Sequence, residues 1–234
     1  MADPDHLLAV LIDADNVPAK YAKAIFDEIA TLGEASARRV YGDFSSDRMN
    51  SWAKEQGDLG LTPIHQPSFT VKKNSSDIAL VIDAMDLMHS GRFDGFVLVS
   101  SDSDFIRLAN RLREQGLGVY GMGEKKTHEA FRKACKRFIY LENLGSNEDE
   151  KAPAPKSESK LDEARKLILR AMDSVEQEDE WVTLGQIGQQ ITALHPDFDT
   201  RTYGKRKLSE LVTELKIFES RNGPGNQLQI RRLD

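Results

Sequence analysis

Two unbroken apolar runs constrain the fold of this chain more than any other feature of its sequence. Residues 7–12 and 96–99 contain no polar side chain, and each run is as long as a single strand. Strands of this kind are buried on both faces, as in parallel sheets whose crossover helices cover both sides. Segments with apolar side chains at helical spacing separate the runs. We therefore expect an α/β domain with a parallel sheet covered on both faces.

The remaining elements of this domain follow from the same patterns. A helix begins near Pro18 and stops at Gly33, and a short helix covers residues 49–55. Strands are predicted over residues 38–41, 61–65, 119–120 and 138–141, with helices over 105–112 and 129–135. Asp77 opens a further helix, which presents one apolar side. The side chains expected on that side are Ile78, Val81, Ile82, Met85 and Met88.

A polar segment divides the chain into two domains. The stretch GSNEDEKAPAPKSESK after residue 144 has no large apolar side chain to offset the entropy of ordering it. We expect a domain over residues 1–145, a flexible linker over 146–160 and a smaller domain over 161–234. The smaller domain reads as a helix over 161–175, a helix capped by Thr183 and running through Ile191, a helix over 200–215, and a hairpin of residues 218–221 and 228–230. This outline predicts a winged-helix-like α+β domain.

Composition narrows the possible environments and partners. The apolar runs are too short to cross a bilayer, the first residues do not resemble a secretory signal, and Cys135 is the single cysteine. These features favour a cytoplasmic protein without a disulfide framework or a thiolate zinc cluster. The formal net charge of −6 argues against binding nucleic acid by bulk electrostatics, so any such binding needs local basic patches.

Acidic side chains follow both apolar runs. Asp13, Asp15 and Asn16 come directly after the first run, and Asp102 and Asp104 come after the second. Asp77 stands at a helix start. Sites in open α/β sheets form beyond the carboxyl ends of the strands, so these carboxylates can share one cleft, where Mg²⁺ or Mn²⁺ would relieve their mutual repulsion. Each aspartate taken alone is equally typical of a turn or a helix cap.

Three stretches resemble the signature motifs of NYN-domain proteins, a branch of the PIN-like nucleases. They are LIDADN, KKNSSDIALVIDAM and FVLVSSDSDF, and the likeness runs over residues 6–144. The resemblance implies a PIN-like, Rossmann-like fold and a ribonuclease that acts on single-stranded RNA with a divalent metal. By position it implies catalytic roles for Asp13, Asn16, Asp77, Asp102 and Asp104, and metal binding by the four aspartates among them. Asn74 and Ser75 stand where the second motif often has a glycine, and Ser101 where the third often has one, which puts the loop shapes in question.

The C-terminal stretch around Trp181, Phe198 and Tyr203 resembles the LOTUS, or OST-HTH, module. This resemblance implies binding of RNA or, in some members, of a helicase partner. Trp181, Phe198 and Tyr203 are expected in the core rather than as stacking platforms. The candidate RNA contacts are Lys72 and Lys73 before Asp77, and Arg201, Lys205, Arg206 and Lys207 at the start of the helix over 200–215. A basic run of this kind is as typical of a solvated helix face.

Two other functions fit parts of the sequence. In a phosphatase of the haloacid-dehalogenase type, Asp13 would be the nucleophile and Asp15 the general acid, with Ser100 and Lys126 as helpers. That reading leaves Asp77 without a role. In an RNA-binding adaptor the acidic pocket would serve no chemistry, although an unused cluster of carboxylates is destabilising. We favour the metal-dependent ribonuclease, and the sequence does not indicate an oligomeric state.

Overall fold

The computed structural model describes residues 6–46, 49–66, 75–144, 157–175 and 180–233. The chain divides into two compact units, residues 1–146 and 147–234. Lys72, Lys73 and residues 146–156 of the expected linker lie outside the described residues. Residues 157–160, also expected in the linker, belong to a helix of the second unit. No helix in the part of the chain that the structure describes has the length and apolar character needed to cross a membrane.

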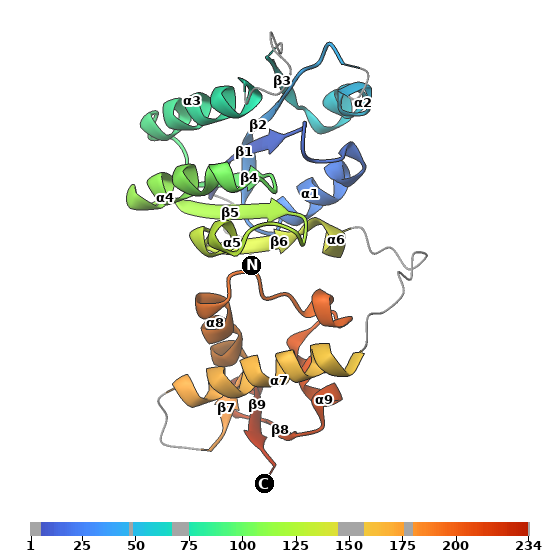
Figure 1. Cartoon of the computed structure of the whole chain (residues 1–234). Coiled ribbons are helices and arrows are strands. Elements are labelled where there is room, and N and C mark those ends of the chain that lie inside the picture. Colours follow the sequence, from blue (N-terminus) through green and yellow to red (C-terminus); the bar gives the residue numbers. More distant parts are fainter. Residues whose placement is uncertain (1–5, 47–48, 67–74, 145–156, 176–179, 234) are drawn as a thin grey trace. The chain divides into compact units, whose positions relative to one another are not determined.

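The first unit is built on a six-stranded sheet in the order β3-β2-β1-β4-β5-β6 (Figure 1). All five neighbouring pairs are parallel. The strands are β1 (Leu7–Asp13), β2 (Glu34–Gly42), β3 (Thr62–His65), β4 (Gly95–Val99), β5 (Gly118–Gly123) and β6 (Arg137–Tyr140). The parallel α/β fold predicted from the apolar runs is confirmed. The strand order reverses between β1 and β4, which is the position where open α/β sheets place their ligands.

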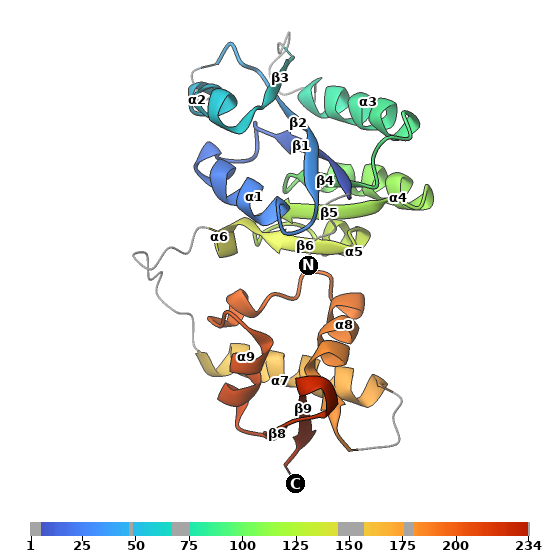
Figure 2. The ribbon, with the colours of Figure 1, turned by 180° about the vertical axis from the view of Figure 1, so that it is seen from behind.

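Alternating side chains of the buried strands face two separate cores. Leu8, Val10 and Ile12 of β1 pack in one core, and Ala9 and Leu11 pack in the other. The helices α1 (Ala22–Ile29), α2 (Asn50–Leu59) and α6 (Leu141–Leu144) cover the first face. The helices α3 (Ser75–His89), α4 (Ile106–Glu114) and α5 (Glu129–Ala134) cover the second. Figures 1 and 2 show the two groups on opposite sides of the sheet.

The predicted apolar side of α3 was correct for Met88, Val81 and Met85, which lie in or against the core. It was wrong for Ile78 and Ile82, which are 60% and 57% exposed, and it missed the buried Leu80 and Ala84. The helix carries apolar residues around most of its circumference, so spacing alone does not identify the buried face. The contacts of Asp83 identify the face that is turned to the sheet, because Asp83 accepts a hydrogen bond of 2.6 Å from the Tyr41 hydroxyl and pairs with Arg39 of β2. These contacts fix how the helix is rotated against the sheet.

Helix α2 is longer than predicted. It runs to Leu59 and ends where Gly60 takes the left-handed conformation, at a φ of 62°.

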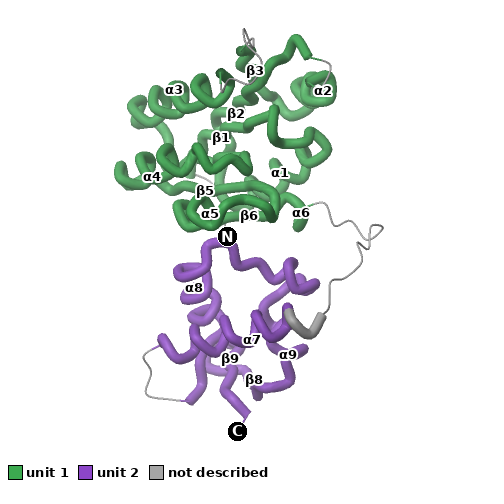
Figure 3. Tube along the Cα trace, in the orientation of Figure 1, with its two compact units in different colours: residues 1–146 green, residues 147–234 purple. Residues whose placement is uncertain are grey.

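The second unit, purple in Figure 3, joins three helices to a small antiparallel sheet. The helices are α7 (Ser157–Ser174), α8 (Leu184–Leu194) and α9 (Leu208–Leu215), and the sheet has the order β7-β9-β8, with β7 (Val182–Thr183), β8 (Phe218–Asn222) and β9 (Leu228–Arg232). Thr183 caps α8 as predicted and forms a capping box with Gln186. Phe198 and Tyr203 pack against the core, as expected. The same expectation was wrong for Trp181, which is half-buried and lies outside this core.

The single helix predicted over residues 200–215 is two elements. A 3₁₀ turn, Thr200–Tyr203, ends where Gly204 takes a left-handed φ of 73°, and α9 begins only at Leu208. Lys205 and Arg206 therefore lie in the connection between two elements, and Lys207 is the residue that precedes α9.

Candidate functional site

The candidate site lies at the carboxyl ends of β1 and β4, where the strand order reverses. Asp13 is the last residue of β1, and Ser100 follows the last residue of β4 directly. Ile12 pairs with Val99, so the two strand ends are level. Asp77 lies in the first turn of α3. The topology thus collects residues from three distant parts of the sequence at one edge of the sheet.

Asp13 is buried and held by two neighbours. Asp13 and Ser100 are each only 1% exposed. The Ser100 hydroxyl donates a hydrogen bond of 2.7 Å to Asp13 Oδ2, and Asn16 Nδ2 donates one of 2.8 Å to the same oxygen. Burial raises the pKa of the Asp13 carboxyl above its usual value, although the bonds from Ser100 and Asn16 oppose this rise. Asp13 is therefore a fixed carboxylate with a defined orientation.

Ser100 also orders the loop that carries the second pair of aspartates. Its Oγ accepts a hydrogen bond of 3.0 Å from the backbone N–H of Asp102. Asp102 in turn caps the 3₁₀ turn Ser103–Phe105, because its Oδ1 accepts a bond of 2.9 Å from the N–H of Asp104. Ser100 thus connects Asp13 to Asp102. The sequence suggests a role for Ser100 only in a phosphatase, although a small polar residue at the end of a buried strand is a signal for the role that the structure shows.

The start of α3 brings a third carboxylate to the same edge. The Ser76 hydroxyl donates a hydrogen bond of 2.8 Å to Asp15 Oδ2, which ties the helix start to the loop after β1. The pKa of Asp77 is raised to about 6, first by burial and then by the negative charges of Asp13, Asp102, Asp15 and Asp104, in that order. Asp77 is therefore within electrostatic reach of the carboxylates on both neighbouring loops.

These side chains fit a divalent cation of the Mg²⁺ or Mn²⁺ type, because they offer carboxylate oxygens as ligands. The repulsion among the carboxylates contributes to the raised pKa of Asp77. The site is not a finished coordination shell. Among the described residues, no three side chains of His, Cys, Asp or Glu are grouped closely enough to hold a metal ion as they stand. A cation would have to draw these carboxylates closer together.

A cleft of about 490 Å³ adjoins the acidic residues on the side of α2. Asp15, Asn16 and Lys20 contribute its polar groups, and Trp52 forms part of its wall. The Trp52 indole donates a hydrogen bond of 2.8 Å to the carbonyl oxygen of Val17, which holds the loop after β1 against α2. The volume lies in the range of small-ligand pockets.

The basic residues predicted to contact RNA in the second unit have acidic neighbours. Arg201 forms an ion pair of 2.7 Å with Asp199, and Lys205 forms one of 3.3 Å with Glu214. Glu210 accepts a hydrogen bond of 3.0 Å from the backbone N–H of Arg206. RNA binding by Arg201, Lys205, Arg206 and Lys207 stays a prediction, and Lys72 and Lys73 lie outside the described residues.

Comparisons with known proteins agree with the motifs. The sequence matches the family model of the NYN domain over residues 7–142 and that of the OST-HTH/LOTUS domain over residues 155–230. No curated protein matches it. A crystal structure of a protein of unknown function from Vibrio parahaemolyticus is 19% identical, with a TM-score of 0.49, over 60% of this chain and 95% of that one. A solution structure of an uncharacterised protein from Nitrosomonas europaea is 29% identical, with a TM-score of 0.27, over 38% of this chain and 84% of that one.

Proposed function

Because the chain belongs to the NYN-domain family, we propose that it is a divalent-metal-dependent ribonuclease that hydrolyses phosphodiester bonds in single-stranded RNA. The C-terminal OST-HTH/LOTUS domain supplies affinity for the RNA. The observation that carries the proposal is the arrangement at the ends of β1 and β4, where Ser100 bonds both Asp13 and the backbone of Asp102. The negative charges of both loops contribute to the raised pKa of Asp77, about 6. A cluster of carboxylates repels a phosphate group until a cation neutralises the charge of the cluster, and this property suits a metal-dependent site.

The residues of the site have separable roles. Asp13, Asp77, Asp102 and Asp104 would hold the cation, and Asn16 would keep Asp13 oriented through its bond of 2.8 Å. When bound, Mg²⁺ or Mn²⁺ stabilises charge on the phosphate oxygens and lowers the pKa of a coordinated water. Ser100 fixes Asp13 and the Asp102 loop relative to each other. The cleft beside Asp15 would receive the adjoining nucleotide, with Lys20 at its margin to contact a phosphate.

The alternative functions differ in what happens to bound RNA. An RNA-binding adaptor would bind single-stranded RNA and leave it intact with or without metal. A phosphatase with Asp13 as nucleophile would act on monoesters, and family membership gives it no support.

The test is cleavage of end-labelled single-stranded RNA and DNA by the full chain, with Mn²⁺ or with EDTA. We expect cleavage of RNA with Mn²⁺ only. Loss of a group that hydrogen-bonds to a metal ligand commonly lowers activity by about 10- to 100-fold. Asp13→Asn and Asp102→Asn change the proposed ligands themselves, so each should lower the cleavage rate by at least about a hundredfold. Asp43→Asn is the matched control, because Asp43 directly follows β2 and its carboxylate accepts a bond of 2.5 Å from Ser45.

Two results would contradict the proposal. The first is cleavage that persists in EDTA, and the second is an equal loss of cleavage in Asp43→Asn and Asp13→Asn. Either result would show that the acidic site does not carry out the reaction. Intact RNA under all conditions, with binding retained, would favour the adaptor.

A further inference from the structure

The three-stranded sheet of the second unit has one face in the core and one face outside it. Val182 of β7 and Ile230 of β9 are paired and buried. Side chains alternate along a strand, so the neighbours of this pair point to the opposite face. On that face Arg231 of β9 pairs with Glu219 of β8, and Trp181 stands directly before β7.

Two arginines flank the Trp181 indole. The guanidinium carbon of Arg221 lies 4.2 Å from the centre of the Trp181 ring, and that of Arg231 lies 4.9 Å from it. Trp181 is half-buried and Arg221 is exposed. Both guanidinium groups lie over the aromatic ring. A base that stacks on Trp181 would take the place of a guanidinium group, and the displaced cation would then bind a phosphate.

The stretch that contains β9 is basic, and two of its arginines have acidic partners. Residues 220–233 include Arg221, Arg231 and Arg232 and no aspartate or glutamate. The acidic partners come from outside this stretch, and Arg231 pairs with Glu219 at 2.6 Å and with Glu180 at 3.4 Å. These pairs are at the surface, where ion pairs are weak, so a phosphate can replace them at small cost.

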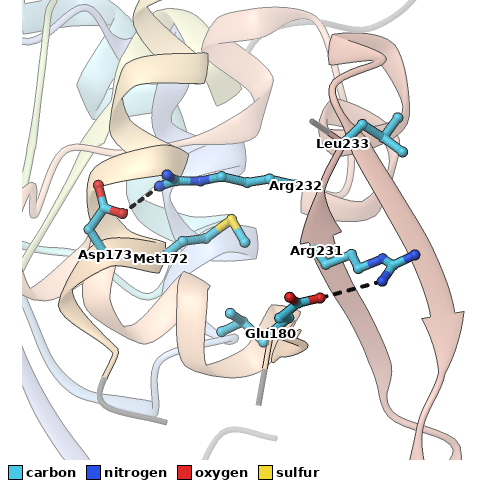
Figure 4. Close-up of a pocket in the computed structure, with 7 residues that line it drawn as sticks. Met172, Asp173, Glu180, Arg231, Arg232 and Leu233 are labelled. Atoms are coloured by element: carbon cyan, nitrogen blue, oxygen red, sulfur yellow. Dashed lines mark hydrogen bonds and ion pairs between the residues drawn. The ribbon is translucent and has the colours of Figure 1, made fainter. Parts of the chain in front are cut away.

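A pocket of about 410 Å³ adjoins Arg231 (Figure 4). Its lining includes the apolar side chains Met172, Val182 and Leu233, and the charged side chains Asp173, Glu180, Arg231 and Arg232. Figure 4 shows the Arg232 side chain reaching Asp173 of α7, an ion pair of 2.5 Å. The pocket is a charged, partly apolar recess next to Arg231, which also contacts Trp181.

From this geometry we infer that the outward face of the sheet β7-β9-β8 binds single-stranded RNA. Trp181 stacks on an unpaired base, and Arg221 and Arg231 bind the adjoining phosphates. The inference rests on the proposed function, which makes RNA the ligand. It places the binding surface on the sheet, where the arginines lie beside an aromatic ring, rather than at the basic connection of residues 205–207.

The test uses the fluorescence of the two tryptophans in the full chain. The protein is titrated with a short oligouridine in EDTA, so that binding is measured without cleavage. Trp52 forms part of the wall of the cleft beside Asp15, so Trp52→Phe is used to isolate the emission of Trp181. We expect RNA to quench the emission of Trp52→Phe, in which Trp181 is the single tryptophan.

Affinity provides the second readout. Stacking of one base on an aromatic ring corresponds to about a five- to hundredfold change in affinity, so Trp181→Ala should weaken oligouridine binding by that factor. Arg221→Ala and Arg231→Ala should also weaken binding and reduce its salt dependence. Arg165→Ala, which removes the same charge from an exposed position on α7, is the control and should bind as the native chain does.

The outcomes separate this inference from the proposed function. If oligouridine binds without quenching Trp181 and Trp181→Ala binds normally, the surface lies elsewhere and the inference is overturned. If Lys205→Glu with Arg206→Glu then abolishes binding, the basic connection is the surface. If the full chain binds no single-stranded RNA, the inference and the RNA-binding role of the module both fail, and a protein partner becomes the better explanation. Circular dichroism of each variant excludes loss of folding as the cause.

Discussion

At the scale of single residues, the surroundings of Asp77 disfavour the ionised form of its carboxyl group. Its pKa in the folded chain is about 6, against an ordinary value of 3.8. Between these values the folded state binds more protons than the unfolded state does. The stability that protonation of Asp77 contributes is therefore fully present below about pH 3.8 and is lost as the pH rises through about 6. At neutral pH without metal, the charge of Asp77 destabilises the fold.

We accordingly predict that Asp77→Asn stabilises the chain above pH 6 in EDTA. After allowance for solvent screening, the gain in the free energy of unfolding should be on the order of 1 kcal/mol, and it should vanish near pH 4. Thermal unfolding followed by circular dichroism at the two pH values measures it. Asp83→Asn, on the same helix, is the control and should destabilise, since Asp83 binds Tyr41 and Arg39. A loss of stability in Asp77→Asn at pH 7 would contradict the assignment.

The sequence identified the aspartates of the site but not what holds them. Asp13, Asp77 and Asp102 follow from strand ends and a helix start, which periodicity locates. The role of Ser100 could not be predicted, because it depends on the close approach of β1 and β4, which are far apart in the sequence. The hydrogen bond between Ser76 and Asp15 depends in the same way on tertiary packing. The joint binding of one metal by these carboxylates stays a prediction.

At the scale of elements, the end of β5 supports the site through a glycine. A methyl group on Gly123 would lie 2.6 Å from the carbonyl oxygen of Ser100 and 2.8 Å from Thr127 Oγ1. The backbone N–H of Ser100 also donates a bond of 2.9 Å to the carbonyl of Met122. The position of Ser100 therefore depends on how closely β5 approaches β4.

Gly123→Ala should force these strand ends apart. We expect a loss of about 1–3 kcal/mol in the free energy of unfolding. We also expect the remaining folded protein to cleave RNA more slowly, because Ser100 no longer fixes Asp13. The comparison variant is Gly118→Ala at the other end of β5, where the nearest atom to the added methyl is on the flexible side chain of Tyr120, at 3.3 Å. Equal cleavage rates for the two folded variants would show that the glycine does not position the site.

The elements themselves were largely predictable, and the errors have physical causes. Continuous apolar runs of strand length that alternate with helices predict a parallel sheet, whereas the order of its strands was not predicted from the sequence. The buried face of α3 could not be read, because its apolar residues surround most of the helix. The break at Gly204 could have been expected, since glycine readily takes a left-handed conformation, but a single glycine does not always end a helix.

At the scale of the whole molecule, the chain consists of two units with separate cores. The proposed chemistry belongs to the first unit, and the proposed RNA affinity belongs to the second. Joining the two raises the effective concentration of bound RNA near the acidic site without any additional contact.

A chain of residues 1–146 should therefore fold alone and keep its cleavage rate at saturating RNA. Its affinity for RNA should fall by about a hundredfold, because the second binding site is lost. Cleavage rates over a range of RNA concentrations separate the two effects. Residues 157–234 serve as the complementary control and should bind RNA without cutting it. A lower rate at saturation for residues 1–146 would mean that the second unit takes part in the chemistry.

The central position of β1 has a consequence for how the protein folds. β1 pairs with β2 on one side and with β4 on the other, and the bond between Asp13 and Ser100 closes a loop of 87 residues. Contacts of such long range form late, because the entropy of closing the loop opposes them until neighbouring structure is in place. Partly folded chains can contain helices and the pair of β1 and β2 while Asp13 still faces water. In a refolding experiment, catalytic competence should then return in the slowest step rather than in proportion to helix content.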